Sequence, residues 1–271
     1  TNFENLWLAS RKARRGKRES SGTLEFEYDL ERNLLDIQAQ LRNEEYEFGK
    51  YKHFKIYEPK EREISAAPYR DRVVHHALCN IIEPILDKAM IYDTYACRAG
   101  KGTHRALDRA QYYLRSSLWI LKIDFKKYFF TIDHAALFAA IEHKIRDDKV
   151  LQLIKQILST YKSGEEYYYT FKGDGIFEYA RNRGLPIGNL TSQLFANYYL
   201  NAVDRFVKEE LKISKYLRYM DDALIFGDSK RELKEVLHQI NEYAVKKRLK
   251  LHERKCQIFL FRGNPCFRGD V

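Results

Sequence analysis

Two adjacent carboxylates, Asp221 and Asp222, stand in a largely apolar and aromatic stretch at 215–228. The flanking residues predict short strands at 216–219 and 223–226, with the carboxylates at the hairpin turn. Burying two neighbouring anions is unfavourable unless a cation accompanies them. The stretch therefore indicates a metal site. The alternative is an Asp pair in an exposed turn, where Asp is common and needs no ligand.

A third carboxylate ends a second apolar stretch. Residues 118–123 are largely apolar and lead into Asp124, which is followed by two lysines and three consecutive aromatic residues. This pattern predicts a buried strand with Asp124 at its carboxyl end, a usual place for sites in mixed sheets. The carboxylates of Asp124, Asp221 and Asp222 would then converge as hard oxygen ligands that suit Mg²⁺. Two such ions about 3.5–4 Å apart would bind the attacking and leaving oxygens of a phosphoryl transfer.

Three stretches together resemble the palm motifs of reverse transcriptases. They are YMDD at 219–222, the Asp124 strand with Phe129 after it, and GLPIGNLTSQLFANYYLN at 184–201. Their order and spacing match along residues 56–259. The resemblance implies an α+β fold, with the fingers and palm of a right-hand polymerase and an antiparallel palm sheet.

The resemblance also implies a reaction, which is RNA-directed DNA synthesis by two-metal nucleotidyl transfer. Asp124, Asp221, Asp222 and the backbone carbonyl of Phe125 would hold two Mg²⁺ ions, with Mn²⁺ as an alternative. The partners would be a template RNA, a DNA or RNA primer, dNTPs and a small basic accessory protein.

The middle motif indicates which group of reverse transcriptases the chain resembles. Most reverse transcriptases carry Gln-Gly and then Ser-Pro there, whereas this chain has Ile187-Gly188 and then Ser192-Gln193. This departure resembles the enzymes of diversity-generating retroelements, which misincorporate opposite template adenines. Ile187 in place of a hydrogen-bonding Gln should weaken discrimination among base pairs, unless it is ordinary packing. The alternatives are a reverse transcriptase of retron, group II intron or phage-defence type, and a non-catalytic RNA-binding protein on this fold.

Further roles follow from the resemblance for single residues. Arg62, with Lys60 as a second candidate, would reach the triphosphate of the incoming nucleotide from a basic hairpin of residues 51–66; a solvated surface Arg is the alternative. Phe129 would fill the space of a ribose 2′-hydroxyl and so select deoxynucleotides. Lys255 would lie near the departing pyrophosphate, unless it is simply exposed.

Two more sets of contacts are expected. Ile187 and Gly188 would lie against the nascent base pair, and Tyr219 would contact nucleic acid. The basic run at 11–18 is either a solvated arm or a grip on the template backbone; its candidate contacts are Arg14, Arg15 and Arg18.

Composition agrees with a polyanionic partner. The 271 residues include 48 Lys and Arg against 38 Asp and Glu, a net charge of +10, and such a surplus favours nucleic acid through counterion release. The four cysteines show no CxxC or zinc spacing, which favours a reduced cytoplasmic protein. The resemblance implies that it is prokaryotic or phage-encoded. Residues 184–203 lack charges but contain Pro186 and polar side chains, so we expect no membrane segment.

The expected organisation is an N-terminal arm and part of the fingers at 1–117, then a palm at 118–271 with a fingers insertion around 150–190. Residues 259–271 are too few for a thumb, so we expect the thumb to be absent or truncated, and the first residue, Thr1, suggests trimming of the chain. Periodicity predicts helices from Thr23 to about 41 and at 73–90, 103–116, 135–145, 149–161, 189–201 and 230–247, and a hairpin of 167–171 with 176–179.

Overall fold

The computed structural model describes residues 2–57, 61–171, 174–175, 177 and 180–261. The chain forms two compact units. Unit 1 comprises Thr1–Leu86, Phe138–Lys162 and Gly184–Phe195, and unit 2 comprises Asp87–Leu137, Ser163–Arg183 and Ala196–Val271. The expected domains at 1–117 and 118–271 stay a prediction, because the two units are defined only by how the chain packs.

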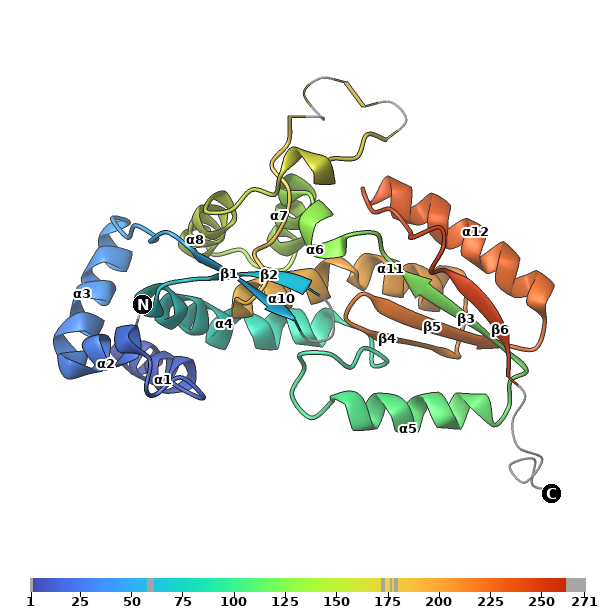
Figure 1. Ribbon diagram of the computed structural model, residues 1–271, viewed down its shortest axis with the longest axis horizontal. Coiled ribbons are helices and arrows are strands. Elements are labelled where there is room, and N and C mark those ends of the chain that lie inside the picture. The colour runs from blue at the N-terminus through green and yellow to red at the C-terminus, as the bar shows by residue number, and fades with distance from the viewer. Residues whose placement is uncertain (1, 58–60, 172–173, 176, 178–179, 262–271) are drawn as a thin grey trace. The chain divides into compact units, whose positions relative to one another are not determined.

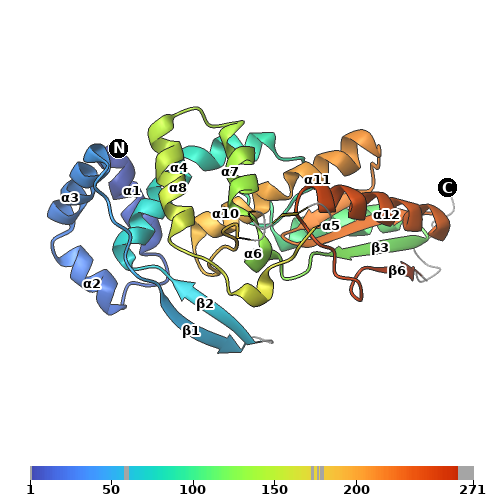
Figure 2. The same ribbon diagram turned by 90° about the horizontal axis from the view of Figure 1, so that it is seen from above.

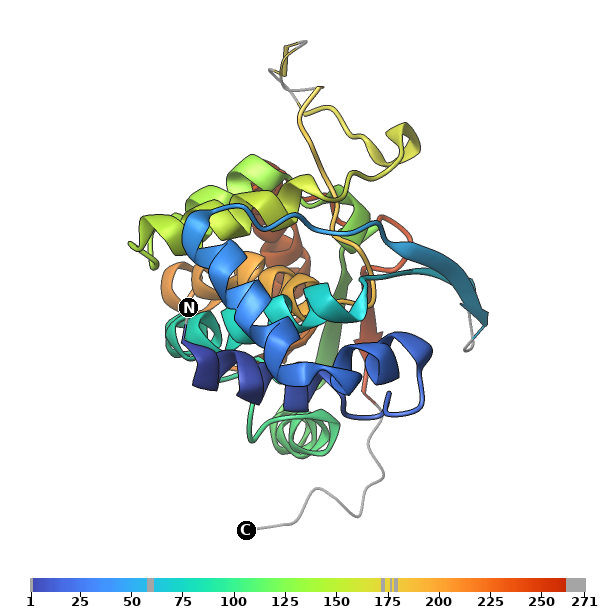
Figure 3. The ribbon, with the colours of Figure 1, turned by 90° about the vertical axis from the view of Figure 1, so that its left-hand side faces the viewer.

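Unit 1 begins with three helices, α1 (Phe3–Ala13), α2 (Ser21–Tyr28) and α3 (Leu30–Asn43), which lie together in Figure 3. Their apolar faces share one core with α4 (Tyr69–Ala89), to which Leu6, Phe26, Leu34 and Val73 contribute. The basic run is therefore not wholly an arm, since its first residues end α1.

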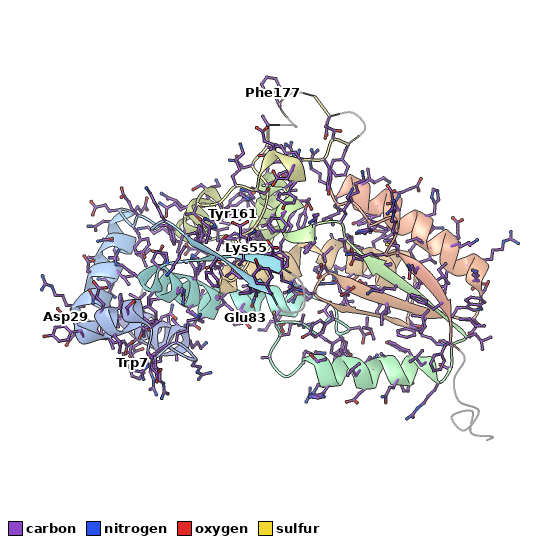
Figure 4. All side chains as sticks on the ribbon, viewed as in Figure 1. Trp7, Asp29, Lys55, Glu83, Tyr161 and Phe177 are labelled. Carbon is purple, nitrogen blue, oxygen red and sulfur yellow. The ribbon has the colours of Figure 1, made fainter. Side chains whose placement is uncertain are left out.

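The expected single helix from Thr23 to 41 is wrong. The chain breaks at Asp29 (φ −128°, ψ 56°), which lies at the corner between α2 and α3 (Figure 4). The side-chain amide of Asn33 donates to the carbonyl of Phe26 over 2.9 Å and so satisfies the end of α2. Thr23 is buried inside α2, where it cannot cap the helix. The break lets both helices turn apolar residues toward the shared core.

The expected basic hairpin is confirmed. β1 (Lys52–Tyr57) pairs antiparallel with β2 (Glu61–Ala66), and Phe54 lies opposite Ile64. This hairpin projects away from the helices of unit 1 (Figure 2). Two further helices, α8 (Asp148–Ser159) and α10 (Leu190–Tyr199), confirm helices expected from periodicity, although α10 ends in unit 2.

Unit 2 is built on a four-stranded antiparallel sheet with the strand order β4-β5-β3-β6. β4 (Tyr216–Tyr219) and β5 (Asp222–Gly227) form the expected central hairpin, and β3 (Trp119–Asp124) confirms the strand that ends in Asp124. β6 (Gln257–Leu260) pairs with the other edge of β3. The sheet therefore brings segments far apart in sequence to the two edges of β3.

Helices cover both faces of this sheet. α5 (Thr103–Leu114) packs on the face that carries Leu217 and Phe226. α12 (Lys230–Lys246) contacts β3, β5 and β6, and its Leu233 lies near Gly227 on the opposite face. Figure 1 shows α5 and α12 on opposite sides of the strands. Unit 2 also contains α11 (Asn201–Arg205), a π-helical turn (Phe206–Glu210), α6 (Tyr128–Thr131) and the start of α7 (His134–Glu142).

The expected hairpin at 167–179 is wrong over its described part. A short 3₁₀ helix (Glu165–Tyr167) is followed by residues 168–171 without strand pairing. Side-chain contacts take the place of the hydrogen bonds of a strand pair in this segment. The rings of Phe130 and Tyr167 stack with their centroids 4.4 Å apart. Arg183 Nη1 donates a hydrogen bond to the carbonyl of Tyr169 over 2.7 Å. The expected second strand falls largely on Ile176, Glu178 and Tyr179, which lie outside the described residues.

The mixed helix and antiparallel-sheet architecture confirms the expected α+β class. None of the helices in the described part of the chain is long and apolar enough to cross a membrane. Residues 262–271, on which the expectation about the thumb partly rests, lie outside the described residues.

Candidate active site

The β4–β5 hairpin places Asp221 and Asp222 at its turn. Tyr219 pairs with Asp222 across the hairpin, and Met220 between the strands has a left-handed φ of 55°. A non-glycine residue in this region is uncommon and is often found at functional sites. Asp221 is half-buried and Asp222 is exposed, so the turn presents one sheltered and one accessible carboxylate.

Asp124 lies directly opposite Asp222. The register of β3 and β5 pairs these two residues, and directly paired residues in an antiparallel sheet point to the same face. The end of β3 is held by the segment before β6, because the backbone N–H of His252 donates to the carbonyl of Asp124 over 2.8 Å. Two of the three predicted carboxylates therefore share one face at one end of the sheet.

Two lysines neutralise these carboxylates. Lys255 Nζ lies 3.2 Å from Asp124 Oδ2, and Lys122 Nζ lies 3.3 Å from Asp222 Oδ1. Burial raises the pKa of Asp221, and the negative charges of Asp222 and Asp124 raise it further. The three carboxylates are thus close enough to repel one another.

This donor set fits a hard divalent cation, although the described residues contain no group of three His, Cys, Asp or Glu already arranged as a metal site. The site offers carboxylate oxygens under mutual repulsion, and the cations beside Asp124 and Asp222 are the ammonium groups of Lys255 and Lys122. Mg²⁺ prefers oxygen ligands of this kind. A metal ion that bound here would displace or shift the two ammonium groups.

Phe125 and Phe129 follow Asp124 closely. Phe125 forms an antiparallel bridge with Leu251, whose hydrogen bonds use the neighbours on either side, Asp124 and Lys126. The hydrogen bonds of the bridge therefore do not involve the carbonyl of Phe125, the atom expected to bind metal. Phe129 is half-buried in α6, with its ring edge-on to Tyr128 at a centroid distance of 5.9 Å.

Unit 1 carries the predicted residues of the middle motif. The carbonyl of Ile187 accepts a 2.9 Å hydrogen bond from the backbone N–H of Ser65, at the end of β2. Gly188 has φ +113°, and a Cβ built on it would lie 2.8 Å from Ile64 Cγ2. The glycine is thus required both by its backbone conformation and by close packing against β2.

The basic candidates of unit 1 differ in their surroundings. Arg62 is exposed on β2, and Lys60 lies outside the described residues. Arg14 is paired with Glu27 at 2.8 Å, whereas Arg15 lines a cavity of about 300 Å³ together with Gly188. Three further cations line the same cavity: Lys12, Lys17 and Arg72. Arg18 is exposed.

Several residues that the sequence reasoning missed surround the carboxylates. Lys122 is two residues before Asp124 on β3, so the alternation of side chains along a strand could have placed it on the same face. Arg218, Asp204 and Asn197 form a buried polar cluster below the turn. In the sequence, the sign of this polar cluster was the charge of Arg218 within an apolar strand. Tyr219, which the sequence did predict, is 40% exposed and accepts a hydrogen bond from Thr103.

Comparison with known proteins decides the family. Residues 50–267 match the family model described as "Reverse transcriptase (RNA-dependent DNA polymerase)". The chain belongs to this family. The match covers both the hairpin with Asp221 and Asp222 and the strand with Asp124.

This reverse transcriptase has curated relatives of low identity. The "Group II intron-encoded protein LtrA" of Lactococcus lactis subsp. cremoris is 26% identical over 195 residues, which are 71% of this chain and 30% of that protein. "Protein YkfC" of Escherichia coli (strain K12) is 26% identical over 187 residues, which are 65% of this chain and 46% of that protein. The chain thus spans less than half the length of either relative.

Solved structures confirm the reverse transcriptase fold. Apo telomerase from Candida tropicalis superposes with a TM-score of 0.57 at 13% identity, over 85% of this chain and 49% of that chain. At such low identity the likeness concerns the fold alone.

Proposed function

We propose that this reverse transcriptase chain is an active RNA-directed DNA polymerase whose reaction takes place at Asp124, Asp221 and Asp222. The observation that carries the proposal is the register that sets Asp124 opposite Asp222, beside a turn that bears Asp221. Their accumulated negative charge needs cations, and two divalent ions supply charge neutralisation for the attacking and leaving oxygens of nucleotidyl transfer when they are bound.

The chain's own residues would orient the reactants. The carboxylates and the Phe125 carbonyl would hold the ions, and Mn²⁺ is an alternative to Mg²⁺. Lys255, whose ammonium group already lies beside Asp124, would neutralise or protonate the departing pyrophosphate. Phe129 would exclude a ribose 2′-hydroxyl. Arg62 or Lys60 would bind the triphosphate through charge-assisted hydrogen bonds.

The proposed substrates are a template RNA, a DNA or RNA primer, and dNTPs. The cavity in unit 1 supports a polyanionic ligand, because four of its lining residues are cations and none is acidic. Phosphate groups are the ligands that such a surface attracts most strongly. Arg15 and Gly188 would contact nucleic acid there. Tyr219 and Arg18 are further proposed contacts, whereas Arg14 would first have to leave Glu27.

The finer proposal is error-prone synthesis of the diversity-generating kind, directed at template adenines. It is supported by Ile187, which is half-buried, aliphatic and fixed by its carbonyl to Ser65. Such a side chain cannot hydrogen-bond a base pair. The rival is synthesis of the group II intron type, which the intron-encoded relative LtrA favours. The proposed further partner is a small basic accessory protein. The proposed location is the cytoplasm, for a chain that is prokaryotic or phage-encoded.

The test measures incorporation of each dNTP opposite each base of a primed RNA template with Mg²⁺. The double variant Asp221→Asn/Asp222→Asn should lose roughly 100-fold or more of the rate. The control is Asp228→Asn, which removes an exposed carboxylate from the other end of β5 and should stay active. Errors mainly opposite adenine would support the diversity-generating type, and accurate copying would favour the group II intron type.

A chain that binds the primed RNA but incorporates no nucleotide with either Mg²⁺ or Mn²⁺ would be an RNA-binding protein on a reverse transcriptase fold.

A further inference from the structure

Arg218 is a buried cation next to the turn that bears Asp221 in the proposed active site. It lies on β4, three residues before Asp221, and is 1% exposed. Its Nε and Nη2 donate to the two carboxylate oxygens of Asp204 over 2.8 and 2.6 Å, a bidentate ion pair. Asp204 is fully buried in α11 and also accepts a 2.5 Å hydrogen bond from Tyr216.

The remaining donors of Arg218 reach two other elements. Nη1 donates to Asn197 Oδ1 over 2.8 Å, and Nη2 donates to the Asn197 carbonyl over 2.9 Å. Nη1 also donates to the carbonyl of Met220 over 2.7 Å. All five N–H groups of the guanidinium are therefore used. Burial opposes the charge, but the carboxylate of Asp204 outweighs it and raises the pKa of Arg218.

The bond to Met220 connects this cluster to the Asp221 carboxylate. The carbonyl of Met220 and the N–H of Asp221 belong to one peptide group, which is planar, so fixing the carbonyl fixes the direction of that N–H. The Cα of Asp221, which bears the carboxylate side chain, belongs to the same planar group, so the hydrogen bond to Met220 also fixes the point from which that side chain extends. Arg218 thus acts on the carboxylate through a rigid unit.

We infer that Arg218 is a positioning residue for Asp221, which it orients through the Met220 carbonyl from an anchor formed by Asp204 and Asn197. This inference rests on the proposed function. Met220 has a left-handed φ of 55°, which the surrounding contacts must hold in place. A buried ion pair is a weak source of stability compared with apolar packing, so the cluster's distinctive contribution is the geometry that it imposes on the turn.

The test compares Arg218→Lys with Arg98→Lys. Arg218→Lys keeps a positive charge beside Asp204 but removes the planar fork that reaches Met220. Arg98 is the matched control in the same unit: its side chain is 8% exposed and bonds Asp87 and the carbonyls of Ile91 and Thr94, none of which belongs to the turn. Both changes should lower the melting temperature.

The decisive readout is Mn²⁺ binding, followed by calorimetric titration and defined as the part that Asp221→Asn abolishes. Arg218→Lys should weaken this binding by about 10- to 100-fold, and Arg98→Lys should leave it unchanged. Primer extension should show the same loss in kcat, with the KM for dNTP unchanged. Equal Mn²⁺ binding by wild type and folded Arg218→Lys would overturn the inference.

Two further outcomes are distinguishable. If Arg218→Lys does not fold, Asp204→Asn replaces it, because this variant keeps the shape of the anchor but removes the negative charge of the ion pair, and its Mn²⁺ binding should fall in the same direction. If wild type binds Mn²⁺ through Asp221 but incorporates no nucleotide, the proposed function fails, whereas the binding comparison still decides the role of Arg218. Absence of any Asp221-dependent Mn²⁺ binding would overturn the inference itself.

Discussion

Lys122 and Asp222 lie on the neighbouring strands β3 and β5, and Lys122 Nζ is 3.3 Å from Asp222 Oδ1. The ammonium group therefore sits where a divalent cation would share the same carboxylate. Lys255 stands in the same relation to Asp124. In the metal-free protein the two lysines relieve the repulsion among the carboxylates, and they compete with any metal ion that binds there.

Replacing Lys122 by Met should tighten Mn²⁺ binding. The ion pair is partly exposed, and such pairs contribute about 0.2–1 kcal/mol, so removing the competitor should raise the affinity by roughly 1.4- to 5-fold. Calorimetric titration measures this change. Lys230→Met is the control, because it removes the same charge near Trp119 at the other end of β3. Weaker binding by Lys122→Met would show that the lysine supports the metal site.

Replacing Phe129 by Ala should relax sugar selectivity. The ring is held edge-on to Tyr128, and removing it would leave space for a ribose 2′-hydroxyl. The ratio of kcat/KM for dNTP over rNTP should fall roughly 10- to 100-fold, measured by single-nucleotide primer extension. Phe130→Ala, which removes the neighbouring ring stacked on Tyr167, should keep the ratio. An unchanged ratio in Phe129→Ala would reject the proposed role.

Replacing Gly188 by Ala should destabilise the protein. The residue has φ +113°, and the new Cβ would approach Ile64 Cγ2 to 2.8 Å. The free energy of unfolding, measured with urea, should fall by about 1–3 kcal/mol. Gly22→Ala is the matched control: Gly22 lies within α2, and its added Cβ would make only an ordinary 3.9 Å contact with Tyr69. That change should leave stability equal or raise it by about 0.5 kcal/mol.

Stability should fall as the pH drops below neutrality, partly because of His75. Burial and the nearby charges of His76 and Arg72 lower the pKa of His75 to about 4. Since the pKa in the unfolded chain is about 6.5, the unfolded state binds more protons between these values. The contribution of neutral His75 is therefore fully present above pH 6.5 and is lost progressively as the pH falls toward 4.

The measurement compares urea unfolding at pH 7 and pH 5. His75→Gln removes this titrating group, so its loss of stability between the two values should be smaller than that of wild type by about 2 kcal/mol. His76, whose pKa is also lowered to about 4, stays in both proteins. Equal losses in wild type and His75→Gln would show that His75 does not titrate in this way.

Much of the fold could be predicted from the sequence, because the strongest patterns are local. The apolar run before Asp124 and the alternation around Asp221 and Asp222 gave strands that the structure confirms within one residue. Two predictions were wrong where side-chain contacts decided the backbone structure. Asn33 ends α2 by bonding the carbonyl of Phe26, and the contacts of Phe130 and Arg183 hold residues 167–171 outside any strand.

The sequence by itself determined which residues carry charge suited to catalysis and which strands bear them, since residue type and period-two alternation are properties of the chain alone. Only the tertiary structure decided the pairing of Asp124 with Asp222, because strand register depends on packing between segments about 100 residues apart. It also revealed the two lysines beside the carboxylates and the five hydrogen bonds of Arg218. These partners come from segments far apart in the sequence, so a local pattern could place Lys122 on a face of its strand but could not pair it with Asp222.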